Sequence, residues 1–373
     1  MKYCRRCILP DSRPGIALDA EGVCSACRGH DDKEFRIDWS ARARAFEALV
    51  AQARAHGADY DCIVPVSGGK DSWYQVIQAQ RHGLKVLGVT WRTPARTAVG
   101  QRNLDRMIDR LGIDHIDHTI NPDVERRFMV EAFERKGATA IPMHMALFAI
   151  PIRLAVQLRI PLILWGENPQ LEFGGPEADR MATDLDSQWI ARYGVTNGTG
   201  WRDWIGPALS ERDLAAYRLP PDDAFAAFSP RSVFLGSFHK WNSFENARVA
   251  AEHGFESGDE HRKTGVWSFA DIDCGFIALH HFLKWYKFGI LRSFDNLSVQ
   301  IRYGMIDRDA AIDALRRDGF SVPQEDIERF CAFAGKPVSW FWDVAERFRN
   351  PDVWRWDGDR WRIPGFIIDD WTW

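Results

Sequence analysis

Six consecutive residues, Ser67-Gly68-Gly69-Lys70-Asp71-Ser72, have the types and the order of a phosphate-binding loop. Two glycines let the backbone approach a phosphate closely, and successive N–H groups at a helix start form a positively polarised concavity. Lys70 can neutralise a phosphate, and the two serine hydroxyls can donate hydrogen bonds to it. Asp71 can act on phosphate through Mg²⁺ or cap the helix. The stretch is therefore predicted to cradle a pyrophosphate, the alternative being a glycine-rich turn with a polar cap.

The loop differs from the Walker pattern of kinases and common nucleotide hydrolases. That pattern has four residues between its first glycine and the Gly-Lys-Ser/Thr triplet. Here Gly68 directly precedes Gly69 and Lys70. Transfer of the γ-phosphoryl group is therefore not the chemistry that the sequence indicates.

A second polar triplet, Gly166-Glu167-Asn168, directly follows the apolar run PLILW (161–165). If that run is a strand, the triplet lies at its carboxyl end, on the same rim as the loop. Glu167 is a candidate Mg²⁺ ligand, Asn168 could orient a substrate, and Gly166 is a candidate contact to ATP. A strand-end turn is the alternative interpretation.

Four of the seven cysteines form two Cys-x2-Cys pairs within the first 27 residues: Cys4, Cys7, Cys24 and Cys27. This spacing is typical of a zinc ribbon with four thiolate ligands, in which the ion is structural. An iron–sulfur centre or unrelated thiols are the alternatives. The remaining cysteines are isolated, and we expect them to be small buried apolar residues: Cys62, Cys274 and Cys331.

The elements that must position these residues alternate in type. Apolar runs at 59–66, 85–91 and 161–165 and a strand-like segment at 115–120 are interspersed with helical patterns at 71–82, 103–111, 123–135 and 143–158. Such alternation predicts an α/β fold with a parallel sheet. An amphipathic helix at 39–56 precedes it, and the chain after about residue 200 is mostly helical and rich in Trp. We expect a ribbon at 1–35, the α/β domain at 36–200 and a helical region at 201–373.

The composition argues against two classes of protein, those that mainly bind nucleic acid and those that span a membrane. The formal net charge of −4 and pI near 6.3 argue against a protein that mainly grips nucleic acid. No apolar run approaches the roughly 18 residues that span a bilayer, so we expect a cytoplasmic protein. The late tryptophans are expected to serve packing or an interface: Trp340, Trp342, Trp354, Trp356, Trp361, Trp371 and Trp373.

SGGKDS resembles the signature loop of the PP-loop ATP pyrophosphatases, which include GMP synthetase, NAD synthetase, asparagine synthetase and the tRNA thiolases. With the N-terminal ribbon and LILWGENPQLEFGG (162–175), the chain resembles the N-acetyl sugar amidotransferases of surface-polysaccharide (lipopolysaccharide) biosynthesis. Segments 278–292 and 301–315 look like helical blocks of the same family. The resemblance implies a Rossmann-like, adenine nucleotide alpha hydrolase-like domain, a zinc ribbon and a helical C-terminal region.

The implied reaction converts an acetamido group on a nucleotide-linked sugar to an acetamidino group, with ATP and Mg²⁺. The amide oxygen would be adenylated, and ammonia would then displace AMP. Lys70, Asp71 and Glu167 are the implied catalytic residues. Residue 2 is Lys, so no N-terminal cysteine nucleophile is available, and no glutaminase elbow is found around the isolated cysteines. A separate glutaminase and companion subunit, like those of imidazole-glycerol-phosphate synthase, are the implied partners.

Candidate substrate ligands beside Asn168 lie in the family-like blocks or near a helix start: His144, Lys284, Lys287, Arg292 and Arg302. The alternative is that the cations are solvated and the histidine structural. Segment 293–298 departs from the family pattern, which leaves the sugar open. A sulfur transferase acting on tRNA is the main competing hypothesis, because thiolases also combine a PP-loop with Cys-x2-Cys pairs. A zinc-ribbon scaffold that merely binds a nucleotide is the non-enzymatic one.

Overall fold

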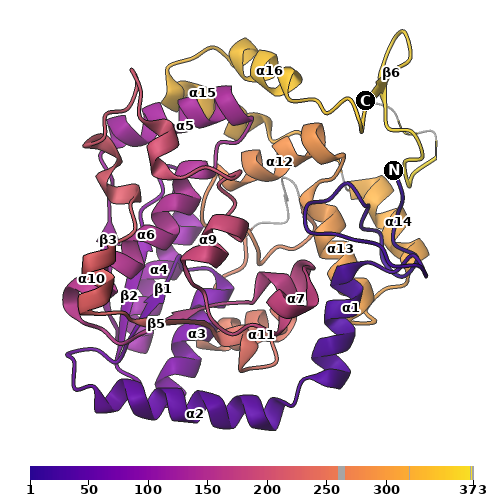
Figure 1. Ribbon diagram of the computed structural model, residues 1–373. Coiled ribbons are helices and arrows are strands. Elements are labelled where there is room, and N and C mark those ends of the chain that lie inside the picture. The colour runs from indigo at the N-terminus through magenta and orange to yellow at the C-terminus, as the bar shows by residue number, and fades with distance from the viewer. Residues whose placement is uncertain (259–264, 319, 370, 372–373) are drawn as a thin grey trace.

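The protein contains a five-stranded parallel sheet in the order β3-β2-β1-β4-β5, which lies in the left half of Figure 1. The computed structural model describes residues 1–258, 265–318, 320–369 and 371. The strands are β1 Cys62–Pro65, β2 Val86–Trp91, β3 Asp114–His118, β4 Leu162–Trp165 and β5 Arg231–Phe234. This order, with its reversal beside β1, is that of a doubly wound nucleotide-binding sheet, in which ligands bind at the carboxyl ends of the strands. The predicted α/β fold is confirmed.

Helices surround the sheet and continue beyond it. In the first two thirds of the chain they are α1 Ser25–Asp31, η1 Asp32–Arg36, α2 Trp39–Ala55, α3 Lys70–Arg81, α4 Ala98–Leu111, α5 Pro122–Lys136, α6 Ile141–Leu158, α7 Pro169–Phe173, α8 Glu177–Met181, α9 Ser187–Tyr193, η2 Trp201–Trp204, η3 Asp213–Tyr217, α10 Asp222–Ala227, η4 Leu235–Ser237 and α11 Ser243–His253. The rest are α12 Ile277–Phe288, α13 Arg292–Arg302, α14 Arg308–Asp318, α15 Gln324–Ala334 and α16 Val338–Arg347, followed by a small hairpin of β6 Arg355–Trp356 and β7 Trp361–Arg362. Helix α4 begins earlier than expected because the Thr97 side chain caps the N–H of Gly100.

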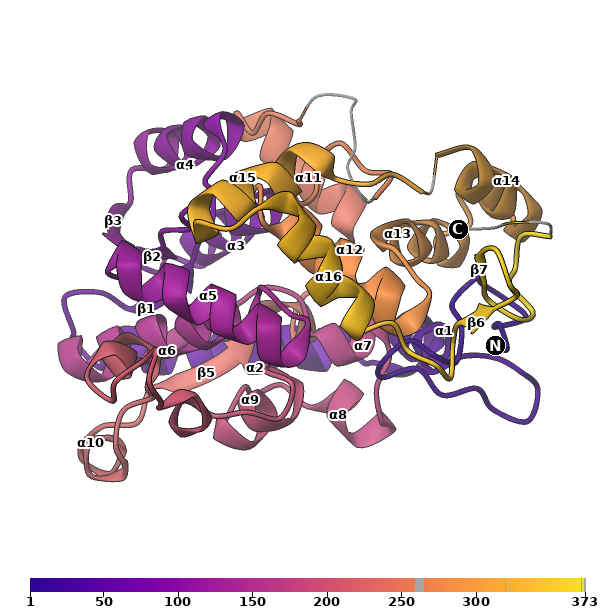
Figure 2. The same ribbon diagram turned by 90° about the horizontal axis from the view of Figure 1, so that it is seen from above.

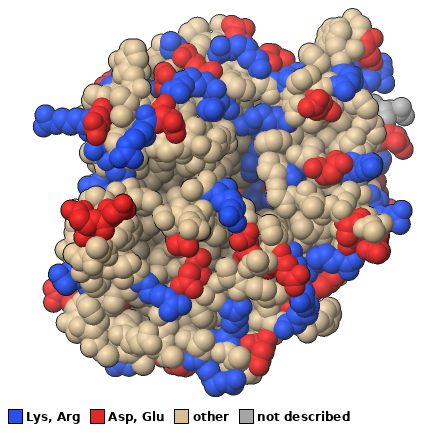
Figure 3. Space-filling view, in the orientation of Figure 1, with Lys and Arg blue, Asp and Glu red and all other residues tan. Residues whose placement is uncertain are grey.

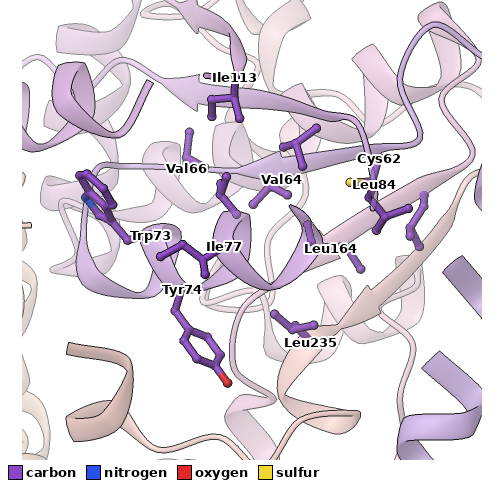
Figure 4. Close-up of a cluster of buried hydrophobic side chains, with 14 of the residues drawn as sticks. Cys62, Val64, Val66, Trp73, Tyr74, Ile77, Leu84, Ile113, Leu164 and Leu235 are labelled. Carbon is purple, nitrogen blue, oxygen red and sulfur yellow. The ribbon is translucent and has the colours of Figure 1, made fainter. Parts of the chain in front are cut away.

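Alternation along the strands divides the core between the two faces of the sheet. In β1, Val64 points to a cluster formed with α2, α3, α4 and α11, whereas Ile63 points to a cluster formed with α5, α6 and α9. Figure 4 shows the first cluster, in which Val64 and Val66 lie against Trp73 and Ile77 of α3. These packed faces hold the loop between β1 and α3 in a fixed place on the rim.

Helix α6 corrects one expectation drawn from composition. It has 18 residues and is apolar enough to cross a membrane by length and composition, contrary to the expectation that no run approaches this length. In the structure 56% of it is buried, and Ala146 and Ile150 pack in the core against the sheet. Its apolar character follows from this core position.

Strand β5 also differs from the expected layout, because it lies in the range 201–373 that was assigned to the helical region. It pairs with β4 from Leu162↔Arg231 to Trp165↔Phe234. Helix α11, further along, packs on α3 within the first core cluster. The sheet unit therefore extends past residue 200.

The remaining helices form two further cores. Helices α12, α15 and α16 pack with Phe133 of α5, and Figure 2 shows α15 and α16 beside that helix. Helices α13 and α14 share a core with the N-terminal ribbon, where Ile8 and Leu9 are buried with Phe294 and Leu297. The predicted ribbon thus shares a buried core with the C-terminal helices.

The tryptophans behave unequally. Trp354 is 1% exposed and makes edge-on contacts with Trp285, which also contacts Trp371. Trp356, in the small hairpin, is 55% exposed. Packing is therefore the role of Trp354, and Trp373 lies outside the described residues.

Candidate active site at the carboxyl rim of the sheet

The predicted phosphate loop connects the end of β1 to the first residue of α3, as the sequence indicates. Gly68 has a φ of +87°, and a Cβ atom there would lie 2.8 Å from the backbone nitrogen of Leu104, so only glycine fits. The Ser67 N–H donates to the Ser72 hydroxyl at 3.0 Å, and the Gly69 N–H donates to the Ser67 hydroxyl at 3.3 Å. The loop thus has a defined shape at the N-terminus of a twelve-residue helix, where anions are favoured.

Lys70 and Asp71 occupy the mouth of this loop. Lys70 is 6% exposed, and its Nζ lies 2.5 Å from Oδ2 of Asp71. The other Asp71 oxygen accepts a hydrogen bond of 3.3 Å from the Asn246 side chain. The lysine also lies over the ring of Phe269, 5.8 Å from its centroid. The cation is thus held close to the loop N–H groups, with a carboxylate that an incoming phosphate can replace.

Glu167 follows β4 on the same rim. The pKa of this carboxyl is raised to about 7, first by burial and then by the neighbouring Asp71 and Glu172 charges, while the Lys70 charge opposes the rise. Two mutually repelling carboxylates beside a phosphate loop favour a divalent cation, which would neutralise both. Among the described residues, Asp71 and Glu167 belong to no cluster of three metal-ligating side chains. Phosphate oxygens would have to complete the coordination of Mg²⁺, as is usual for this ion.

The residues Asp271 and Asp273 complete the rim but were missed from the sequence. The Ser67 hydroxyl donates to Asp273, whose pKa is nevertheless raised because burial dominates. Asp271 pairs with Arg292 (Nε to Oδ2, 3.1 Å) and with His281 (Nε2 to Oδ1, 3.6 Å). Burial opposes ionisation of Asp271, but the Arg292 charge and the contact with His281 outweigh it and hold the pKa of Asp271 well below the usual range. Only the folded chain brings this Asp-x-Asp segment to the loop, since it is about 200 residues away in sequence.

Asn168 has a different position from the one expected of a substrate ligand. It is 1% exposed, and its Oδ1 caps α7 by accepting from the N–H groups of Gln170 and Leu171. Its Nδ2 donates to the carbonyl of Ala182 at 3.0 Å. Because both ends of the amide are occupied, Asn168 positions the turn after β4. Gly166 belongs to the same turn, where a Cβ would lie 3.3 Å from the Gln75 side chain.

The other candidate substrate ligands divide into two groups. Lys284 and Lys287 line a pocket of about 470 Å³ together with His280, and the ring of His144 lies 5.6 Å from that of His280. Burial lowers the pKa of His144 to about 4, so its ring is neutral at pH 7. Figure 3 shows a hollow near the middle of this face with Lys and Arg side chains at its borders.

Arg292 and Arg302 lie outside that pocket. Arg292 is committed to Asp271, as described above. Arg302 donates to the backbone carbonyl of Glu172 at 3.0 Å, and the ribbon cysteines raise its pKa against the effect of burial. Its contacts therefore support the ribbon rather than a substrate.

The four N-terminal cysteines converge as predicted. Around a zinc ion with Zn–S distances of about 2.3 Å, the sulfurs of a tetrahedral site lie about 3.8 Å apart. Here the Sγ atoms of Cys4 and Cys27 are 3.9 Å apart, those of Cys7 and Cys24 are 3.6 Å apart, and all four lie within 4.8 Å of one another. N–H groups of Arg6 and other residues donate to the sulfurs, as in a thiolate site. The geometry fits one tetrahedral ion.

Comparisons with known proteins show similarity to solved structures and to one family model. The solved structure of NMN synthetase from Francisella tularensis overlaps with a TM-score of 0.32 and 10% identity, over 80% of this chain and 94% of that chain. No curated protein matches the chain. The family model described as LPS biosynthesis protein WbpG-like, C-terminal domain, matches residues 241–365, about one third of the chain. In the part that contains α11 to α16, the chain is therefore similar to the C-terminal domain of WbpG-like lipopolysaccharide biosynthesis proteins.

Proposed function

We propose that this protein is an ATP-dependent amidotransferase that converts an acetamido group of a nucleotide-linked sugar to an acetamidino group. The observation that carries the proposal is the SGGKDS loop at a strand-to-helix junction, with Lys70 and Asp71 at its mouth and Glu167 on the same rim. The similarity of residues 241–365 to a lipopolysaccharide biosynthesis domain supports a biosynthetic role in surface polysaccharide.

The chemistry begins with attack of the amide oxygen on the α-phosphorus of ATP. The bond from that phosphorus to the β-phosphate oxygen breaks, which releases pyrophosphate and leaves an O-adenylyl imidate. Ammonia adds to the imidate carbon and loses protons, and the C–O bond breaks to release AMP and the amidine. Adenylation is needed because an amide carbon is a poor electrophile with a poor leaving group.

The residues divide this work between them. Lys70 and the loop N–H groups of Gly68 and Gly69 would stabilise charge on the departing pyrophosphate, with the hydroxyls of Ser67 and Ser72 at its edge. Asp71 and Glu167 would hold Mg²⁺, which supplies charge neutralisation to the phosphates when bound. Zinc at the four cysteines would be structural. Ammonia would come from a separate glutaminase with its companion subunit, in the cytoplasm.

The sulfur-transferase alternative is less well supported by the thiols. A persulfide-bearing cysteine needs an accessible thiolate with a low pKa. Cys62 is fully buried in β1, and burial raises its pKa. Burial raises the pKa of Cys274 to about 11, and its Sγ lies 2.9 Å from the Thr93 hydroxyl.

The test combines purified protein with ATP, Mg²⁺, ammonium chloride and a panel of UDP- and CMP-linked N-acetyl sugars. AMP, pyrophosphate and sugar mass are followed together. We expect sugar-dependent AMP release and a loss of about one mass unit from the sugar, both abolished in Lys70→Ala and kept in the surface control Lys85→Ala. AMP formation that needs tRNA and a sulfur donor instead would replace the amidotransferase with a thiolase.

A further inference from the structure

We propose that the pocket between the zinc ribbon, α7, α9 and α12 binds the anionic group of the substrate, with the ribbon as one of its walls. The ligand is an oxyanion, either the diphosphate of a nucleotide-linked sugar or a sugar carboxylate. This inference rests on the proposed function for the identity of the substrate, but the pocket itself is tested independently below.

Among the described residues, the Lys and Arg residues that line the pocket have no acidic lining residue beside them. The pocket's cationic lining residues are Arg13, Arg192, Lys284 and Lys287, and none of the described residues that line it is Asp or Glu. Its volume of about 470 Å³ is in the range of small-molecule sites. A concave site with several cations and no lining carboxylate selects an anion.

The two lysines lie in the pocket with no carboxylate of the described residues in direct contact, although the charge of Asp295 raises the pKa of Lys284 against the effect of burial. Among the described residues, no carboxylate oxygen lies within 4.0 Å of the Nζ of Lys284 or of Lys287. Lys284 instead lies 3.3 Å from Nδ1 of His281. Burial lowers the pKa of each lysine to about 8. Keeping two partly desolvated ammonium groups together costs free energy, and an anionic ligand would offset that cost.

The ribbon supplies the wall that faces α7. Residues 13–15 line the pocket, and Arg13 is fixed by its Nε bond of 2.6 Å to Asp295 and an Nη1 bond of 3.1 Å to the carbonyl of Phe173. A Cβ on Gly15 would lie 3.3 Å from the carbonyl oxygen of Gly174. Because the ribbon also shares a buried core with α13, its zinc site positions this wall.

The opposite wall contains strained backbone. Val195 and Asn197 both line the pocket and have φ values of 56° and 53°. A β-branched residue rarely adopts positive φ, and such strain persists mainly at functional sites. The loop is therefore held in a costly shape where it meets the pocket.

The pocket also adjoins the reaction site. Pro169 and Gln170 line it and lie two and three residues after Glu167 along the chain. From the other side, Lys284 contacts His281, which faces Asp271 on the rim. A substrate could therefore keep its charged end beside the lysines while its acetamido group reaches the phosphate loop.

The experiment measures binding to the full-length zinc-loaded protein by titration calorimetry, without turnover. The probes are UDP-N-acetylglucosamine, UDP and glucuronate, and ATP is titrated separately. The variants are Lys284→Met, Lys287→Met and Arg13→Met, with the exposed Lys85→Met as the matched control. Zinc content and circular dichroism verify that each variant is folded, and Arg13→Lys replaces Arg13→Met if the latter does not fold.

We expect each pocket variant to weaken at least one probe about tenfold or more, with ATP affinity and the control variant unchanged. Loss of the two UDP probes identifies the diphosphate, and loss of glucuronate identifies a carboxylate. If no probe binds the wild-type protein, or the lysine variants bind all probes as it does, the pocket assignment is wrong. If only the Arg13 variants bind normally, the ribbon is not part of the site. Pocket-dependent binding without AMP formation from any sugar would refute the amidotransferase while leaving the pocket intact.

Discussion

Glu167 should release a proton when Mg-ATP binds. Its pKa is raised to about 7 by burial and by the Asp71 and Glu172 charges. Binding of Mg²⁺ with the nucleotide reverses this electrostatic environment and favours the ionised carboxylate. The perturbation is therefore simple: titrate the protein with Mg-ATP in the absence of sugar, at several pH values.

The size of the effect follows from the pKa. A group with a pKa of about 7 carries about nine-tenths of a proton at pH 6, about half at pH 7 and about one-tenth at pH 8. If the bound state is fully ionised, Glu167 releases about these fractions on binding. Apparent affinity for Mg-ATP should accordingly rise with pH through this window, by up to about tenfold between pH 6 and pH 8.

Calorimetry in buffers of different ionisation enthalpy counts the released protons. The nucleotide contributes protons of its own, so the informative quantity is the difference between wild type and Glu167→Gln, which cannot titrate. We expect that difference to be largest at pH 6 and to nearly vanish at pH 8. Equal release by the two proteins at pH 6 would refute the assignment of Glu167 to the metal-binding rim.

Three further predictions concern stability and the ion at the ribbon. Lys33 is 2% exposed, and its Nζ donates to Glu172 at 2.7 Å. Lys33→Met should therefore lower the free energy of unfolding, measured with urea, by about 3–5 kcal/mol, because it leaves the Glu172 carboxylate buried and unpaired. The double variant with Glu172→Gln should recover part of that loss. Glu125 is 2% exposed, and its pKa is raised to about 8 mainly by burial. Between about pH 4.5 and pH 8 the native state therefore binds a proton at Glu125 that the unfolded state has lost, so the free energy of unfolding should fall as the pH rises through this range. Glu125→Gln should reduce this dependence of stability on pH. One zinc ion per chain is expected by elemental analysis, and Cys24→Ser should lose it together with several kcal/mol of stability; retention of full stability without metal would contradict a structural site.

Local sequence patterns were sufficient to predict the first four strands of the sheet, because β1, β2 and β4 are short apolar runs and each of the four strands lies beside a helical pattern. Strand β5 was missed because Arg231 and Ser232 begin it and only Val233 and Phe234 are buried, so four residues gave little periodic signal. Pairing with β4 makes it a strand. The core that the ribbon shares with α13 was not predicted for a related reason, since these partners are almost 300 residues apart in sequence.

At the candidate site, too, the sequence predicted features formed by neighbouring residues and missed those formed by residues far apart in the chain. The phosphate loop and the cysteines were predicted because their residues are close in sequence, and backbone geometry alone determines much of their arrangement. Asp271 and Asp273 were missed because nothing in the sequence near them indicates a site. Only the tertiary structure places Asp273 beside Ser67. Asn168 was expected to meet substrate, yet the same amide is an effective helix cap, and burial decided between the two roles.

The contacts at the rim indicate why residues 36–200 alone would not hold the predicted phosphate loop in its observed position. Asn246 of α11 donates a hydrogen bond to Asp71, and Asp273 accepts one from Ser67, so two residues beyond position 200 bind the loop. A fragment ending at residue 200 would lack both, and it would also expose the edge of β4 that β5 covers. From the other end of the chain, the ribbon buries Lys33 against Glu172, five residues after Glu167. The loop would supply the proposed chemistry, but segments far apart in the sequence determine the position and charge of the groups around it.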